Sequence, residues 1–302
     1  MAHPGDAEVA TPSLGVRAAL ATLILTNLVW GGSLPATKLG LAEFSPFLLA
    51  WLRLTLSALL FALAIPRRQL RALGSRAWLS LVGLGVIGYG GTIGLQTLGT
   101  TITTGSSASV LASISPIFIP LIALVWLRER PKWSTVAGLL AALAGVALVL
   151  GLDPTDPDLV SGQHLSGDLL LLVSSLCFGI FTVVGKGSTR RHSPLLVSGV
   201  TCLGGVLGLS LPAALELAAG LPRPSLLGWG VIGYLGGVVT FAGMLAYFWA
   251  LRAVPASRGG VFLFLQPVSG LVLASLLLGD VLSPSFLLGT ALVLAGVYLV
   301  AR

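Results

Sequence analysis

Charged side chains are scarce in this sequence. Asp, Glu, Lys and Arg make up 9% of its 302 residues, whereas soluble proteins carry about 25%. Apolar residues account for 55%, and the mean hydropathy is +0.99. The apolar runs are continuous and do not alternate as they would in a β-barrel. The composition therefore excludes an ordinary soluble domain and indicates an all-α integral membrane protein.

Cysteine and histidine are also rare, with two and three residues respectively. Cys177 and Cys202 both lie inside apolar runs, so we interpret them as small packing residues and not as a disulfide. The sequence has no His/Cys spacing typical of a metal site, no carboxylate pair on one helix face and no Gly-rich phosphate-binding motif. We therefore expect no metal, no cofactor and no enzymatic activity.

Ten apolar runs are long enough to span a bilayer, and charged residues or Pro/Gly turns separate them. Residues 1–19 are predicted to form a cytoplasmic N-terminal tail, and residues 153–168 an external linker. The expected helices cover residues 20–37, 47–65, 78–98, 107–127, 136–152, 169–185, 195–215, 226–250, 259–278 and 286–300.

The few charges are unevenly distributed between the two sides of these segments. The side that would hold both termini carries 14 of the 17 Lys and Arg residues, and the opposite side carries 7 of the 10 acids. By the positive-inside rule, both termini are predicted to be cytoplasmic in a multi-pass protein of a bacterial-type inner membrane. The net charge of +7 is explained in this way without a nucleic-acid partner.

The two halves of the chain resemble each other. At an offset of 151 there are 13 identities over the 45 positions from Ser106 to Leu150. Residues 20–152 and 169–302 would hold five helices each, and an odd number inverts the second half relative to the first. Inverted repeats are typical of secondary transporters, whose substrate site lies near the midplane. At an offset of 148, Trp30 matches Phe178, Lys38 matches Lys186, and Ser45-Pro46 matches Ser193-Pro194.

Three segments carry a resemblance to a known family. They are WGGSLPATKLGL at residues 30–41, SISPIFIPLIALVWLRERP ending at Pro131, and VPASRGGVFLFLQPVSGLVLASLLLGD at residues 254–280. Together they resemble the EamA branch of the drug/metabolite transporter superfamily. The resemblance implies ten transmembrane helices in two inverted five-helix repeats around a central cavity. Within that branch the chain is similar to bacterial amino-acid exporters, including exporters of aromatic amino acids.

Polar and aromatic side chains within the spans are candidates for contact with a substrate, because polar groups in the hydrocarbon tend to face a cavity. Asn27 and Trp30 share a helix face, as do Tyr89 and Gln96; interhelical hydrogen bonding is the alternative role for each pair. In the second half of the chain, Tyr247 is assigned to the position that corresponds to Gln96 in the first half. The expected substrate-binding residues are Asn27, Trp30, Tyr89, Gln96, Ser106, Ser107, Phe178, Tyr234, Tyr247 and Gln266.

A second set of residues is assigned to the pathway or its gates. Arg53 is the clearest charge within a span, and it either reaches outward, pairs with Glu43 or binds a carboxylate. Lys38 and Lys186 are either gates or anchors at the headgroups. Two prolines are predicted to kink helices in mid-span. The full set is Lys38, Arg53, Pro116, Lys186, Arg258 and Pro267.

These observations favour a secondary transporter that exports small amphipathic metabolites, above all amino acids, by alternating access. The alternatives are transport of drugs or of anionic metabolites such as nucleotide sugars, and the anions would require several Arg or Lys in the cavity. An integral membrane enzyme or a channel is more remote. The expected partners are a small-molecule substrate and the lipid bilayer. Matched glycines in the last helix of each half predict close packing or a homodimer, so the protein is expected to be a monomer or a homodimer.

Overall fold

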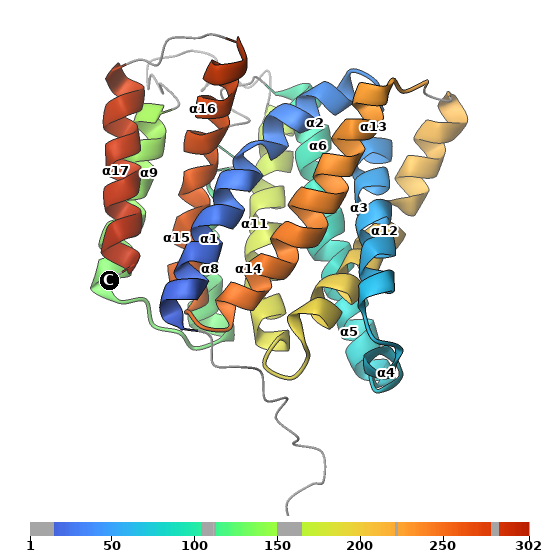
Figure 1. Cartoon of the computed structure of the whole chain (residues 1–302), viewed down its shortest axis with the longest axis horizontal. Helices are drawn as coiled ribbons and strands as arrows, with labels where there is room; N and C mark the ends of the chain where they lie inside the picture. Colours follow the sequence, from blue (N-terminus) through green and yellow to red (C-terminus); the bar gives the residue numbers. More distant parts are fainter. Residues whose placement is uncertain are drawn as a thin grey trace, which may run out of the picture.

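The computed structural model describes residues 15–103, 111, 113–149, 165–220, 223–278 and 284–301. Helices make up most of this part of the chain, and it contains no strand (Figure 1). Eight helical stretches within it are long and apolar enough to cross a membrane. The all-α membrane class is thus confirmed. The stretches are Val16–Leu41, Pro46–Ala64, Ser75–Ile102, Leu165–Ser188, Pro194–Ala219, Leu226–Leu251, Ala256–Leu273 and Pro284–Ala301.

Two further apolar helices, α8 (Ser115–Trp126) and α9 (Trp133–Val149), are shorter than these spans. Each of the ten predicted segments therefore contains a helix, while ten membrane crossings and the inversion of the second half stay predictions. Several spans are longer than expected. The first comprises α1 (Val16–Gly31) and α2 (Ser33–Leu41), and α11 runs from Leu165 to Ser188. Charged residues near the helix ends do not stop backbone hydrogen bonding, which the membrane favours.

The repeated Ser-Pro pairs begin corresponding helices. Ser45 precedes α3 (Pro46–Ala64), and Ser193 precedes α12 (Pro194–Ala219). Proline fits the first helical position because its missing N–H would have no partner there. In α12 the Ser193 hydroxyl also accepts a hydrogen bond from the amide of Leu196 at 3.2 Å. The repeated Ser-Pro pairs thus mark corresponding helix starts in the two halves of the chain.

Two spans are interrupted by π-helix at corresponding positions. The third span consists of α5 (Ser75–Gly85), η1 (Val86–Gly94) and α6 (Leu95–Ile102). The stretch Leu226–Leu251, which is the eighth of the ten predicted segments, consists of α13 (Leu226–Gly233), η3 (Tyr234–Ala242) and α14 (Gly243–Leu251). The bounds of η1 and η3 are 148 positions apart at both ends. This register makes Met244 the counterpart of Gln96, so the assignment of Tyr247 to that role, which used an offset of 151, is wrong.

The two prolines predicted to kink helices lie near the starts of helices. Pro116 stands in the first turn of α8, where a proline costs no hydrogen bond. Part of the segment before it lies outside the described residues, so a kink of the segment 107–127 at Pro116 stays a prediction. Pro120 is the proline inside α8. Pro267 stands near the start of α16 (Leu265–Leu278), directly after the 3-10 turn η4 (Phe262–Phe264) that follows α15 (Ala256–Val261). A proline at this point fits the local break in α-helical geometry.

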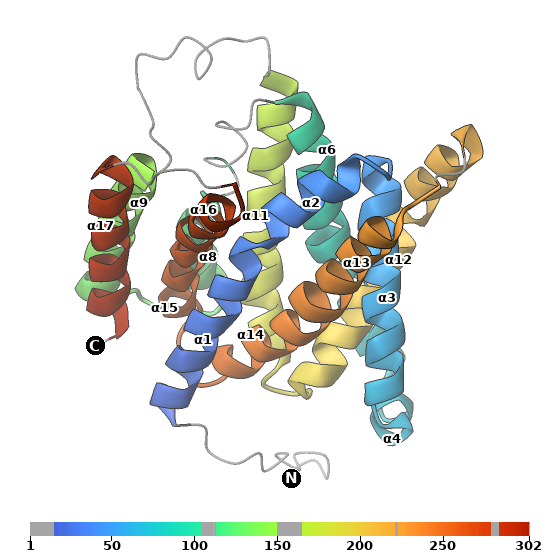
Figure 2. The ribbon, with the colours of Figure 1, turned by 45° about the horizontal axis from the view of Figure 1, so that its top comes forward.

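The last helices of the two halves, α9 and α17 (Pro284–Ala301), pack against each other at one edge of the bundle (Figures 1 and 2). A Cβ atom added to Gly145 would lie 2.6 Å from the carbonyl oxygen of Gly289, and one added to Gly138 would lie 2.6 Å from that of Gly296. The matched glycines thus permit close contact of the two backbones, as expected. A homodimer stays a prediction.

The beginning of α1, the end of α17 and the Arg-rich helix α4 (Arg67–Arg71) lie at one end of the bundle (Figure 1). This placement agrees with an even number of crossings between the two ends of the described chain. It also gathers basic residues at one end, as the count of charges predicted. Which side of the membrane this end faces stays a prediction.

We predict that Gly145→Val destabilises the protein by about 1–3 kcal/mol, because the new side chain must separate two backbones in contact. The measurement is thermal unfolding of the purified protein in detergent. Gly233→Val is the matched control, since a Cβ atom at this exposed glycine would have nothing within 4 Å. Equal effects of the two variants would contradict the close contact of α9 and α17.

Candidate functional site

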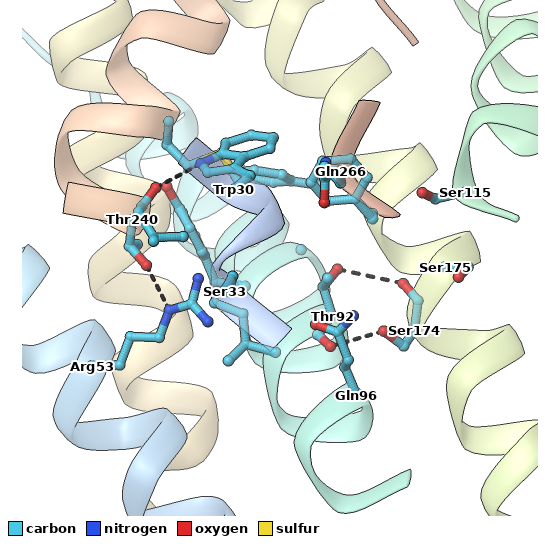
Figure 3. Close-up of a pocket in the computed structure, with 17 residues that line it drawn as sticks. Trp30, Ser33, Arg53, Thr92, Gln96, Ser115, Ser174, Ser175, Thr240 and Gln266 are labelled. Carbon is cyan, nitrogen blue, oxygen red and sulfur yellow. Dashed lines mark hydrogen bonds between the residues drawn. The ribbon is translucent and has the colours of Figure 1, made fainter. Parts of the chain in front are cut away.

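A cavity lies among most of the spans and holds about 700 Å³ of space free of protein atoms, its opening included (Figure 3). Its lining residues come from the first, third, fourth, sixth, eighth and ninth predicted segments, and from α3, which contributes Arg53. The lining residues are Trp30, Ser33, Arg53, Gly88, Tyr89, Thr92, Ile93, Gln96, Ser115, Ser174, Ser175, Phe178, Phe181, Val239, Thr240, Met244 and Gln266.

Half of the predicted substrate-binding residues line this cavity, namely Trp30, Tyr89, Gln96, Phe178 and Gln266. Two others lie directly behind the lining. Asn27 accepts a hydrogen bond from the Gln266 amide at 3.0 Å, and the ring of Tyr247 packs 5.2 Å from that of Trp30.

Tyr234 does not line the cavity, and its hydroxyl donates to the carbonyl of Val29 at 2.7 Å. The hydroxyl thus links η3 to α1, and a contact of Tyr234 with the substrate stays a prediction. Ser106 and Ser107 lie outside the described residues.

Aromatic rings form an apolar wall of the cavity. The Trp30 indole is fixed by a 2.9 Å hydrogen bond from its Nε1 to the carbonyl of Val239 in η3. Its ring meets Phe178 of α11 edge to face at 6.2 Å, and Tyr89 packs against Phe181 at 4.7 Å. Such contacts stabilise rings beyond simple burial. The wall therefore joins residues of both halves of the chain.

Arg53 places a buried positive charge in the cavity. Only 9% of the residue is exposed, and its Nε donates to the Thr240 hydroxyl at 2.7 Å. The two Nη atoms have no hydrogen-bond partner among the described residues, and Figure 3 shows the guanidinium directed toward the cavity beside Ser33. Arg53 therefore keeps its planar two-donor edge for a ligand, the geometry that suits a carboxylate.

None of the acids in the described part of the chain pairs with Arg53. The predicted Arg53–Glu43 pair is wrong, because Glu43 accepts instead from the amide and the hydroxyl of Ser225, at 2.6 and 2.7 Å, at the start of α13. The other three described acids have partners as well: Glu216 binds the amide of Leu48, Asp168 the hydroxyl of Thr103, and Glu129 the ammonium of Lys186.

The other predicted cations lie away from the cavity. Lys38 is exposed, whereas Lys186, its counterpart in the repeat, is buried. A role at the headgroups is therefore wrong for Lys186. Arg258 donates to the carbonyl of Ala301 at the end of α17, and neither Arg258 nor Pro116 nor Pro267 is a lining residue.

Lys186 forms a buried ion pair that joins three segments. Its Nζ lies 2.6 Å from Glu129 Oε1 and also donates to the carbonyl of Val254 at 2.7 Å. The second oxygen of Glu129 accepts from the amide of Ala256, the first residue of α15, at 2.8 Å. Burial of a charged group is tolerated when it is paired and hydrogen-bonded. This pair therefore ties the loop after α8, the end of α11 and the turn between α14 and α15 together.

Sequence reasoning missed several hydroxyl residues of the lining, among them Ser33, Thr92, Ser115 and Thr240. The repeat holds a signal for two of them, since Thr92 and Thr240 are 148 positions apart and both lie in π-helix. Thr92 is in addition linked to α11, because its carbonyl accepts from the Ser174 hydroxyl at 2.8 Å. Within the described residues, no cluster of His, Cys, Asp and Glu has the arrangement of a metal site.

A multi-pass helical membrane protein whose cavity is built from both halves has the architecture of a secondary transporter. A family model, the EamA-like transporter family, matches residues 17–151 and again residues 165–302. The chain belongs to this family, which confirms the resemblance seen in the sequence. The family and the relatives described next are transporters.

Three comparisons place the chain more closely. An uncharacterized transporter of Archaeoglobus fulgidus is 32% identical over 93% of this chain and 97% of its own. A probable terminal-alkyne amino-acid exporter of Streptantibioticus cattleyicolor is 27% identical over 93% of this chain and 92% of its own. A solved crystal structure shares the fold with a TM-score of 0.78 at 18% identity, covering 94% of this chain and 96% of the other.

We predict that Lys186→Met destabilises the protein by about 1–3 kcal/mol, because the Glu129 carboxylate, whose side chain is 15% exposed, loses its cation while it stays largely shielded from water. The double variant Glu129→Gln with Lys186→Met removes both charges and should recover most of that loss. Thermal unfolding in detergent measures both. The single variants are Lys186→Met and Glu129→Gln. If the loss of stability in the double variant equals the sum of the losses in these two, a direct pair is contradicted.

Proposed function

We propose that this protein is a secondary transporter of the inner membrane that exports small amphipathic metabolites, amino acids above all, by alternating access through the described cavity. Both termini face the cytoplasm, and residues 20–152 and 169–302 form the two inverted five-helix repeats. The matching positions of η1 and η3 support this repeat. The fold and the family agree with transport, and the nature of the substrate rests on the lining of the cavity.

One observation carries the proposal: Arg53 is the one cation among the described lining residues, and no described acid neutralises it. A buried charge is costly in a membrane protein unless it has a partner or a function. A substrate carboxylate supplies that partner. The aromatic wall of Trp30, Phe178 and Phe181 then faces the apolar part of the same molecule, which fits amino acids, aromatic ones included.

Because Arg53 is the one cation among the described lining residues, the cavity is poorly suited to substrates that carry several negative charges. A nucleotide sugar or a phosphorylated metabolite requires a cluster of Arg or Lys. The candidates for such a cluster were Lys38, Lys186 and Arg258, and these lie outside the lining. The printed name of the Streptantibioticus relative, a probable terminal-alkyne amino-acid exporter, supports the choice of amino acids.

The lining also bears on energy coupling. The described lining residues include no Asp, Glu or His, which are the usual residues of intramembrane proton relays. We propose that export runs down the gradient of the substrate without a proton relay made of carboxylates in the cavity.

The test is counterflow of labelled phenylalanine into liposomes that contain the purified full-length protein. Arg53→Gln should lower the rate at least about tenfold, because a charge-assisted bidentate contact is lost. Arg53→Lys should keep part of the activity, since it keeps the charge but not the planar fork. Arg68→Gln, which removes an exposed cation of α4 outside the lining, is the matched control.

Normal counterflow by Arg53→Gln would refute the role of Arg53. Wild-type counterflow of sugar phosphates but not of any amino acid would refute the proposed substrate class.

A further inference from the structure

A chain of side-chain amides leads from α1 to the cavity. Asn27 is fully buried in α1, and its Nδ2 donates to the carbonyl of Leu23 at 2.7 Å. A backbone carbonyl can only accept, so this bond fixes which end of the Asn27 amide faces the helix. The Asn27 oxygen must then point to Gln266, where it accepts from Nε2 at 3.0 Å.

This arrangement determines what Gln266 offers to the cavity. Its Nε2 is directed at Asn27, so the oxygen Oε1 remains on the cavity side, as Figure 3 shows. No hydrogen bond to Oε1 is found among the described residues. An amide oxygen can only accept. Gln266 thus presents an acceptor, although a glutamine in general could present either end.

Close contact between the backbones of α1 and α16 fixes the relative positions of the Asn27 and Gln266 side chains. A Cβ atom on Gly31 of α1 would lie 2.7 Å from the carbonyl oxygen of Gln266, and one on Gly270 of α16 would lie 2.8 Å from the carbonyl oxygen of Gly31. Glycine at both positions lets α1 and α16 touch directly, and the contact lies one turn along α1 from Asn27. The orientation of Gln266 is therefore built into the packing of these helices.

We infer that the Gln266 Oε1 accepts a hydrogen bond from the ammonium group of the substrate, while Arg53 binds the carboxylate. Arg53 and Gln266 stand apart in Figure 3 with the cavity between them, the first a cation that only donates and the second a neutral acceptor. Such a site is complementary to a zwitterion. It favours amino acids over carboxylic acids that lack the amine. This inference rests on the proposed function and adds Asn27 as its positioning residue.

The test compares three probes on the purified full-length protein by isothermal titration: phenylalanine, 3-phenylpropionate, which lacks the amine, and phenethylamine, which lacks the carboxylate. Wild-type protein should bind phenylalanine most tightly. Gln266→Leu should weaken phenylalanine about tenfold and change 3-phenylpropionate by less than about twofold, because only the ammonium contact is lost. Gln69→Leu, the same change in α4 away from the cavity, should leave all three affinities unchanged.

A further variant keeps the inference testable if Gln266→Leu does not fold. Asn27→Leu removes the acceptor that orients Gln266, so it should lower the preference for phenylalanine over 3-phenylpropionate without weakening 3-phenylpropionate.

Several results would overturn the inference. Equal loss of phenylalanine and 3-phenylpropionate binding in Gln266→Leu would mean that Gln266 donates to the carboxylate. Wild-type protein that binds 3-phenylpropionate as tightly as phenylalanine would leave the Arg53 site standing and refute the ammonium site alone. Wild-type protein that binds no amino acid would refute the proposed function together with this inference.

Discussion

The cavity depends on one buried charge that the described protein leaves without a counterion. Arg53 is held at its Nε by Thr240, and the Thr240 hydroxyl donates in turn to the carbonyl of Leu235 at 2.8 Å. Behind it, Ser57 donates to the carbonyls of Arg53 and Gly236, which joins α3 to η3. The surrounding helices thus position the guanidinium and leave its outer edge to a ligand. A guanidinium held in this way can pair with a negatively charged group of matching planar shape.

The two π-helical segments explain how the bundle accommodates these groups. A π-helix shifts the hydrogen-bond register of its span, and such segments occur frequently at functional sites. Thr92 in η1 and Thr240 in η3 occupy matching positions, yet one is linked to α11 through Ser174 and the other orients Arg53. The two halves of the chain therefore share a backbone plan but carry different polar groups. That difference gives the cavity a cationic side and a neutral polar side.

Much of the fold could be predicted from the sequence, because continuous apolar runs and Ser-Pro starts are local signals. The cavity is lined by residues from the first, third, fourth, sixth, eighth and ninth predicted segments and by Arg53 of α3, which the sequence placed among the pathway residues. Contacts between distant residues were not predictable. Lys38 and Lys186 match in the repeat, yet one is exposed and the other is paired with Glu129. The pairing of Arg53 with Glu43 likewise could be excluded only from the structure, in which Glu43 binds Ser225.

The central claim is that Arg53 faces the cavity and is covered by the bound substrate. It can be tested by arginine modification of the purified protein with phenylglyoxal, read residue by residue by mass spectrometry. The account predicts that Arg53 is modified in the free protein and that saturating phenylalanine slows its modification, while the exposed Arg68 reacts equally in both conditions. An Arg53 that reacts at the same rate with and without the amino acid would contradict the account.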